Sequence, residues 1–125
     1  MTKIIVKTDN APAAIGTYSQ GVGFNGTYYF SGQIGLDSTT QLLVEGFSAQ
    51  LKTVMQNIDG LLSSQGLTRD NIIKTTIFLT DLNNFAEVNQ AYIEFFKEPY
   101  PARSTIEVSK LPKGSLVEIE VIAAK

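Results

Sequence analysis

Arg103, in the stretch YPARSTIEV, is one of only two arginines in a chain that has no histidine and no cysteine. A proline stands two residues earlier and an alternating pattern follows, so we expect Arg103 at the entrance of a strand. Its guanidinium presents paired donors that match a carboxylate in bidentate geometry. A structural ion pair with Glu107, Glu118 or Glu120 is the alternative, although surface pairs contribute only about 0–1 kcal/mol.

Glu118 and Glu120 point to one side of the last predicted strand. One of them can position or activate water as a general base, and two desolvated carboxylates raise each other's pKa; alternatively, both face solvent. The glycines of SGQIG, residues 31–35, either let a ligand approach the backbone or form a turn. Tyr18 can contact a small ligand or be a half-buried aromatic. Asn89, beside the apolar stripe of the second predicted helix, can bond to backbone or to a neighbouring subunit.

The composition excludes several classes of function. Without histidine or cysteine there is no histidine-based triad, thiol nucleophile or thiolate metal site, and the acids show no ligand spacing, so no metal is expected. The net charge is -2 and the basic residues are scattered, which disfavours nucleic acid as a partner. No apolar run approaches the ~20 residues of a membrane helix and the N-terminus lacks a signal peptide, so we expect a soluble cytoplasmic protein without a membrane partner.

Length and composition fit a single domain, residues 1–125, with one hydrophobic core. Helical periodicity predicts helices over 45–65 and 84–97, and Asn84 with Glu87 resembles a capping box at the start of the second. Alternation and β-branched runs predict the strands. These strands are expected at 3–8, 18–24, 27–32, 71–80, 103–108 and 116–124.

This order of elements predicts an α+β fold with a single mixed β-sheet and two helices on one face. Within 71–80, alternation gives one face formed by Ile73, Thr75, Ile77 and Leu79. The opposite face of the sheet is mixed in character and carries Lys74, Thr76, Phe78, Glu118, Glu120 and Ile122. We interpret it as a surface that packs on another subunit, and a solvated face is the alternative.

Four segments together closely resemble the RidA family, also called YjgF/YER057c/UK114. They are APAAIGTYSQG, FSGQIG, KTTIFLTDLNNFAEVNQAY and PARSTIEVSKLPKGSLVEIEVIA, and they span nearly the whole chain. The resemblance implies a chorismate-mutase-like fold and a homotrimer with clefts between adjacent subunits. It also implies an enzyme without a cofactor that hydrolyses 2-imino or enamine acids, such as 2-aminoacrylate, 2-iminobutanoate and 2-iminopropanoate, to 2-keto acids and ammonia. Such activity protects other enzymes from intermediates that escape pyridoxal-phosphate enzymes.

Carried over by position, the resemblance assigns Arg103 to the substrate carboxylate and Glu118 to the attacking water. Gly32 and Thr105 would contact the ligand through their backbones. The other residues implied to line the cleft are Tyr18, Ser31 and Asn89. This chemistry suits the composition, because an imine carbon is already electrophilic and positioned groups with a water molecule suffice.

Three positions depart from the family pattern. Thr17 replaces the proline of GPY, Gly35 replaces the proline of GQIP, and Thr105 stands where the family has a cysteine. A glycine at position 35 is expected to loosen the loop beside the cleft and alter substrate preference. If the thiol has a function of its own, that function is absent here.

Two other functions remain open. A non-catalytic trimer that binds small carboxylates would use the same arginine. A ribonuclease activity has been attached to relatives, but an acidic chain without histidine is a poor physical fit for it.

Overall fold

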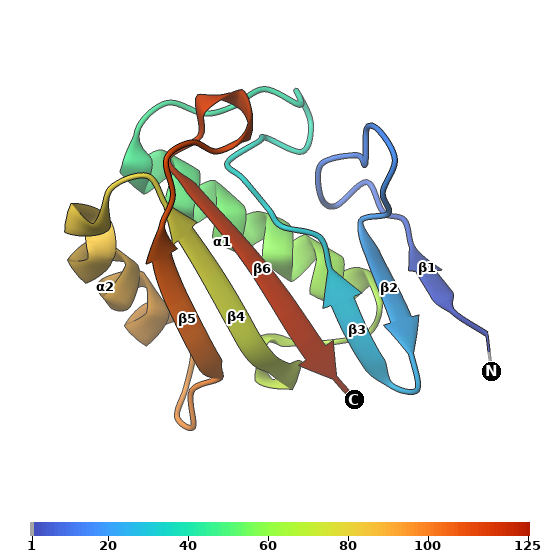
Figure 1. Ribbon diagram of the computed structural model, residues 1–125. Coiled ribbons are helices and arrows are strands. Elements are labelled where there is room, and N and C mark those ends of the chain that lie inside the picture. Colours follow the sequence, from blue (N-terminus) through green and yellow to red (C-terminus); the bar gives the residue numbers. More distant parts are fainter. Residues whose placement is uncertain (1) are drawn as a thin grey trace.

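The computed structural model describes residues 2–125 and contains one mixed sheet with two helices packed against one face (Figure 1). The strands lie in the order β1-β2-β3-β6-β4-β5. Their bounds are Ile4–Val6 (β1), Gly21–Phe24 (β2), Thr27–Phe30 (β3), Ile72–Leu79 (β4), Ala102–Glu107 (β5) and Val117–Ala124 (β6). The helices are α1, Phe47–Ser64, and α2, Phe85–Phe95, with 3-10 turns at Arg69–Asn71, Leu82–Asn84 and Pro112–Gly114. The predicted order of elements is confirmed.

The last strand fills the centre of the sheet. β2 and β3 form a hairpin through Asn25 and Gly26, which both take the positive φ that a tight turn requires. β6 then pairs antiparallel with both β3 and β4, while β4 and β5 run parallel. β5 is therefore an edge strand, and Glu118 and Glu120 on β6 lie well inside the sheet.

The hydrophobic core lies between the sheet and the helices. Alternate residues of β6, including Val117 and Ile119, are buried, as are Ile77 and Leu79 of β4. Both helices contribute an apolar stripe to this core, formed by Leu51, Val54, Ile58, Leu61, Val88, Tyr92 and Phe95 among others. Within residues 2–125, neither helix is long and apolar enough to cross a membrane.

A β-bulge overturns one predicted face. The register of β4 against β6 shifts between Ile72 and Lys74, so Ile72 takes the buried position and Ile73 is 51% exposed. The prediction that Ile73 shares the face of Thr75 is therefore wrong. A bulge adds one residue to a strand and flips the side chain that alternation assigns to the core.

The predicted capping box at α2 is also wrong. The side chain of Asn84 makes no capping hydrogen bond. Glu87 instead accepts a hydrogen bond from the hydroxyl of Ser48 on α1, which links the two helices. The preceding 3-10 turn is capped by Asp81, whose carboxylate accepts from the backbone N–H of Asn83 at 2.9 Å.

Within residues 2–125, no helix covers the second face of the sheet (Figure 1). Phe78 and Ile122 are half-buried there, whereas Tyr29, paired with Ile122, and Ile106, paired with Phe78, are exposed. A face with this much apolar surface is typical of a surface that contacts another protein chain.

Candidate functional site

Arg103 lies on the helix side of β5, beside α2. Its partner in the parallel register is Thr75, which is buried against the same helix. The guanidinium carbon lies 5.1 Å from the ring centroids of both Phe85 and Tyr92. The aromatic residues of α2 therefore flank the charged group of the edge strand.

Arg103 makes no ion pair within residues 2–125, because the one pair found there joins Arg69 to Asp59 at 2.8 Å. The structural alternative, a pair with Glu107, Glu118 or Glu120, is therefore wrong. Glu107 accepts a hydrogen bond from the backbone N–H of Leu82 at 2.9 Å instead.

Arg103 lines a pocket of about 340 Å³, which we call the arginine pocket. It is lined by Asn89, Tyr92, Ile93, Tyr100, Pro101 and Arg103. Thr105 lies two residues beyond Arg103 on the same face of β5, with its hydroxyl buried. Among the residues that the structure describes, that hydroxyl finds no hydrogen-bond partner. The arginine pocket thus offers unpaired donors beside an apolar wall.

A second pocket, of about 570 Å³, is lined by four of the other residues predicted for the site, and we call it the glutamate pocket. The four are Tyr18, Ser31, Gly32 and Glu118. Glu118 is half-buried and Glu120, at the rim, is exposed. The solvent-facing alternative therefore holds for Glu120 and fails for Glu118.

Backbone pairing to β6 places Gly32 against the carboxylate of Glu118. Gln33 and Ile119 exchange two backbone hydrogen bonds of 2.8 and 3.0 Å, which anchor the segment after β3 to the central strand. A Cβ built on Gly32 would overlap that carboxylate, 2.9 Å from its Cδ. This close approach requires glycine.

Gln20 organises the loop that carries Tyr18. Its buried amide accepts from the N–H of Thr8 at 2.7 Å and donates to the carbonyl of Pro12 at 2.8 Å. The hydroxyl of Ser31 donates to the carbonyl of Ser19 at 2.6 Å. The loop is therefore fixed at both ends, and Tyr18 projects from it with 56% of its surface exposed, which rules out the half-buried alternative.

Burial raises the pKa of the Glu118 carboxyl, and the charge of Glu120 raises it further. A carboxyl shifted in this way is better matched to proton transfer near neutral pH than an ordinary surface glutamate. The glutamate pocket therefore contains a group suited to general base catalysis.

The two pockets lie on opposite faces of the sheet. Glu118 pairs with Phe78, which pairs with Ile106, and Ile106 is three residues beyond Arg103 with its side chain on the other face. Two strand spacings and three residues of rise place the Cα atoms of Arg103 and Glu118 about 14 Å apart. One chain therefore does not bring the predicted pair together in one cleft.

Sequence reasoning missed the aromatic surroundings of Arg103. Helical periodicity alone places Phe85 and Tyr92 in the apolar stripe of the second helix and indicates nothing about the arginine. Phe85, Asn89 and Tyr92 are spaced i, i+4 and i+7, which places all three on one face of α2. This spacing was the sequence signal that could have grouped the two rings with the predicted site residue Asn89. Tyr100 and Pro101, next to Arg103 in sequence, complete the pocket.

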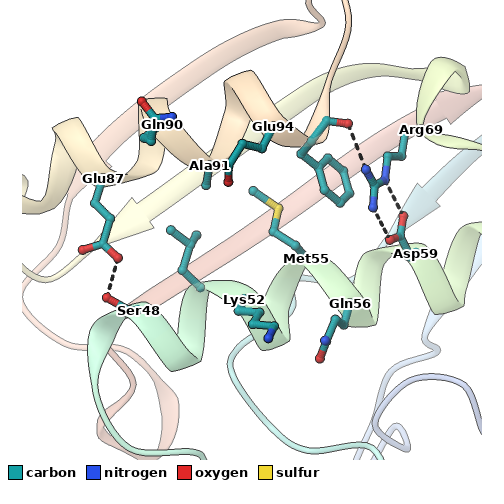
Figure 2. Close-up of a pocket in the computed structure, with 12 residues that line it drawn as sticks. Ser48, Lys52, Met55, Gln56, Asp59, Arg69, Glu87, Gln90, Ala91 and Glu94 are labelled. Atoms are coloured by element: carbon teal, nitrogen blue, oxygen red, sulfur yellow. Dashed lines mark hydrogen bonds and ion pairs between the residues drawn. The ribbon is translucent and has the colours of Figure 1, made fainter.

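The groove between α1 and α2 contains none of the predicted site residues (Figure 2). It measures about 500 Å³, and apolar side chains such as Met55 and Ala91 lie between the two helices. At one end the guanidinium of Arg69 binds Asp59 and stacks 3.9 Å from the ring of Phe95. Within residues 2–125, no cluster of three or more acidic side chains is placed to hold a metal ion.

Comparison with known sequences gives a consistent result. A family model described as Endoribonuclease L-PSP matches residues 8–125. A RutC family protein of Aquifex aeolicus is 45% identical over 96% of this chain and 98% of that protein. Two proteins named 2-iminobutanoate/2-iminopropanoate deaminase are also similar. The one from Salmonella typhimurium is 45% identical over 100% of this chain and 99% of that protein, and the one from Homo sapiens is 43% identical over 95% and 88%.

Solved structures match over the same length. YyfA from Yersinia pestis, of the Rid protein family, has a TM-score of 0.96 at 52% identity and covers 99% of this chain and 100% of its own. E. coli TdcF with bound serine has a TM-score of 0.92 at 39% identity over 98% of each chain. Sequence and fold agree along almost the entire chain, which therefore belongs to the Endoribonuclease L-PSP family, the YjgF/RidA family.

Proposed function

We propose that the protein hydrolyses small 2-imino and enamine acids to 2-keto acids and ammonia. The observation that carries the proposal is a pair of incomplete pockets: one presents a guanidinium that no carboxylate of residues 2–125 pairs with, and the other presents a half-buried carboxylate that no cation of the same residues pairs with. A small organic acid that requires water activation needs both groups. Relatives at 43–45% identity that are named 2-iminobutanoate/2-iminopropanoate deaminase support the same reaction.

The complete cleft forms where the arginine pocket of one copy meets the glutamate pocket of the next. β5 is an edge strand, and the uncovered face of the sheet carries exposed apolar side chains. Packing this edge on the uncovered face of another copy buries both surfaces. Such a contact joins two different patches, so it closes into a ring only at a fixed number of copies. The resemblance to the RidA family implies that this number is three, a homotrimer with three clefts.

Arg103 binds the substrate carboxylate through two charge-assisted hydrogen bonds. Asn89, Thr105 and, from the neighbouring copy, the backbone of Gly32 surround the small side chain and the nitrogen. Tyr18 and Ser31 close the cleft on the other side. The serine bound to TdcF has a carboxylate next to a nitrogen-bearing carbon, which is the arrangement that such a cleft would bind.

Hydrolysis then needs a water molecule directed at C2. Glu118, in its ionised form, accepts a proton from this water as the new C–O bond forms, and the protonated imine becomes a carbinolamine. The proton passes from Glu118 to the nitrogen, the C–N bond breaks, and the hydroxyl loses a proton as the carbonyl forms. The products are a 2-keto acid and ammonium, so no redox partner is required.

The test adds the purified protein to a pyridoxal-phosphate dehydratase that consumes threonine or serine and follows release of 2-keto acid. We expect faster release with the wild-type protein and no acceleration with Arg103→Ala. An unchanged rate with wild-type protein, or an active Arg103→Ala variant, overturns the proposal. If pyruvate binds to the wild type but no imine is turned over, the non-catalytic carboxylate-binding trimer replaces it.

A further inference from the structure

We propose that Phe85 and Tyr92 form an aromatic clamp that positions Arg103 for the substrate carboxylate, an inference that rests on the proposed function. Both ring centroids lie 5.1 Å from the guanidinium carbon, within the range of a cation–π contact. The two rings come from α2, whereas Arg103 comes from β5, so the clamp connects two separate elements.

Tyr92 is the fixed side of the clamp. It is buried, and its hydroxyl donates to the hydroxyl of Thr75 at 2.9 Å. Thr75 is the β4 residue paired with Arg103 in the parallel register. Phe96 packs against the Tyr92 ring with centroids 5.0 Å apart. The ring is thus anchored to the strand position next to the arginine.

Phe85 is the exposed side of the clamp. It is the first residue of α2, is 39% exposed and lies outside the buried core, unlike Val88 and Phe95 of the same helix. Burial in the core therefore does not explain why position 85 carries a phenylalanine, whereas contact between its ring and Arg103 does.

The clamp holds the guanidinium without occupying its donors. An aromatic ring attracts the cation through its π system and has no carboxylate oxygen to occupy the N–H groups, so these donors stay available for a bidentate carboxylate. Arg69 shows the contrasting arrangement, because its N–H groups are bound by Asp59 and by the carbonyl of Phe95. An acidic partner for Arg103 would restrain it equally well but would compete with the substrate.

Tyr92 is also kept neutral. Burial raises its pKa to about 12, although the hydrogen bond to Thr75 and the charge of Arg103 both act in the opposite direction. The phenol therefore stays protonated under physiological conditions and offers no negative charge that would hold the guanidinium away from the substrate.

The decisive variant is Phe85→Leu, which removes the ring and retains apolar bulk at an exposed site. A carboxylate bound by a pre-positioned arginine stabilises the ground state and the transition state equally, so we expect a higher KM at unchanged kcat. Loss of a partly exposed cation–π contact predicts a rise in KM and in the Kd for pyruvate of about two- to fivefold. Phe85→Tyr restores the ring and should restore both constants.

Phe47→Leu is the matched control, because Phe47 is the first residue of α1, as Phe85 is of α2, and lines neither the arginine nor the glutamate pocket. It should leave KM at the wild-type value. An unchanged KM in Phe85→Leu, a fall in kcat alone, or a failure of Phe85→Tyr to rescue overturns the clamp while the deaminase function stands. A wild type that binds pyruvate without turnover overturns only that function, and the Kd comparison still decides the clamp; a wild type with neither property overturns both.

Discussion

The two arginines of the chain allow the same substitution to be made at a functional and a structural position. Arg103→Lys keeps the charge but loses the fork that binds a carboxylate at two points. A hydrogen bond to a charged group contributes about 1.5–3 kcal/mol. Loss of one such bond predicts a fall in kcat/KM of about 10- to 150-fold.

Arg69→Lys makes the identical change in the groove between the helices. Its ion pair with Asp59 is partly exposed, so its loss should lower the free energy of unfolding by no more than about 1 kcal/mol. Because Arg69 lies in neither the arginine nor the glutamate pocket, kcat/KM should stay within about twofold of wild type.

The assay measures initial rates of 2-keto acid formation from imino acid generated in place by an amino acid oxidase. Urea unfolding of each variant separates loss of fold from loss of function. A wild-type kcat/KM for Arg103→Lys, or an equal loss in a folded Arg69→Lys, would refute the assignment of Arg103 to the substrate carboxylate.

Four further predictions concern Glu118 and two glycines. The raised pKa of Glu118 means that wild-type activity should fall with decreasing pH already above the range of an ordinary glutamate, and Glu118→Gln should abolish the activity at every pH. Between the ordinary and the raised pKa the folded state binds more protons than the unfolded state, so stability falls as pH rises; Glu118→Gln should remove that slope in pH-dependent unfolding. Gly32→Ala should displace the Glu118 carboxylate, so kcat should fall strongly while the melting temperature changes little. Gly35→Ala should cost about 1–3 kcal/mol of stability in urea unfolding and leave kcat intact, because its Cβ would lie 2.8 Å from the Cα of Gln50.

Gly35 is held in a closely packed position rather than in a loose loop. From sequence, a glycine in place of the family's proline was expected to loosen the loop beside the cleft. In the structure Gly35 is buried, its carbonyl accepts from the N–H of Val44 at 2.9 Å, and α1 leaves no room for a side chain. Close packing is therefore a better account of this glycine than flexibility.

The order of elements could be predicted because helix and strand periodicity are local properties of the sequence. The bulge beside Ile73 could not, since it depends on how β4 pairs with β6. The insertion of β6 between β3 and β4 also depends on pairing between distant segments.

The candidate site likewise combines features that the local sequence predicts with features that depend on strand pairing. The candidate residues, Thr105 among them, come from the family resemblance, and the position of Arg103 at the entrance of a strand could be predicted from the proline and the alternation around it. The separation of Arg103 from Glu118 follows only from the strand order and register, which place the two side chains on opposite faces. In the proposed function the unpaired guanidinium and the half-buried carboxylate are two halves of one site, contributed by two copies of the chain.

The central claim is that one cleft takes Arg103 from one chain and Glu118 from its neighbour. Arg103→Ala and Glu118→Gln are each expected to be inactive, and co-refolding them in equal amounts tests the claim directly. Averaged over all the trimers that random mixing forms, roughly one cleft in four receives both intact groups, so about a quarter of the wild-type activity should return. If mass spectrometry confirms mixed trimers and the mixture remains inactive, the shared cleft is contradicted.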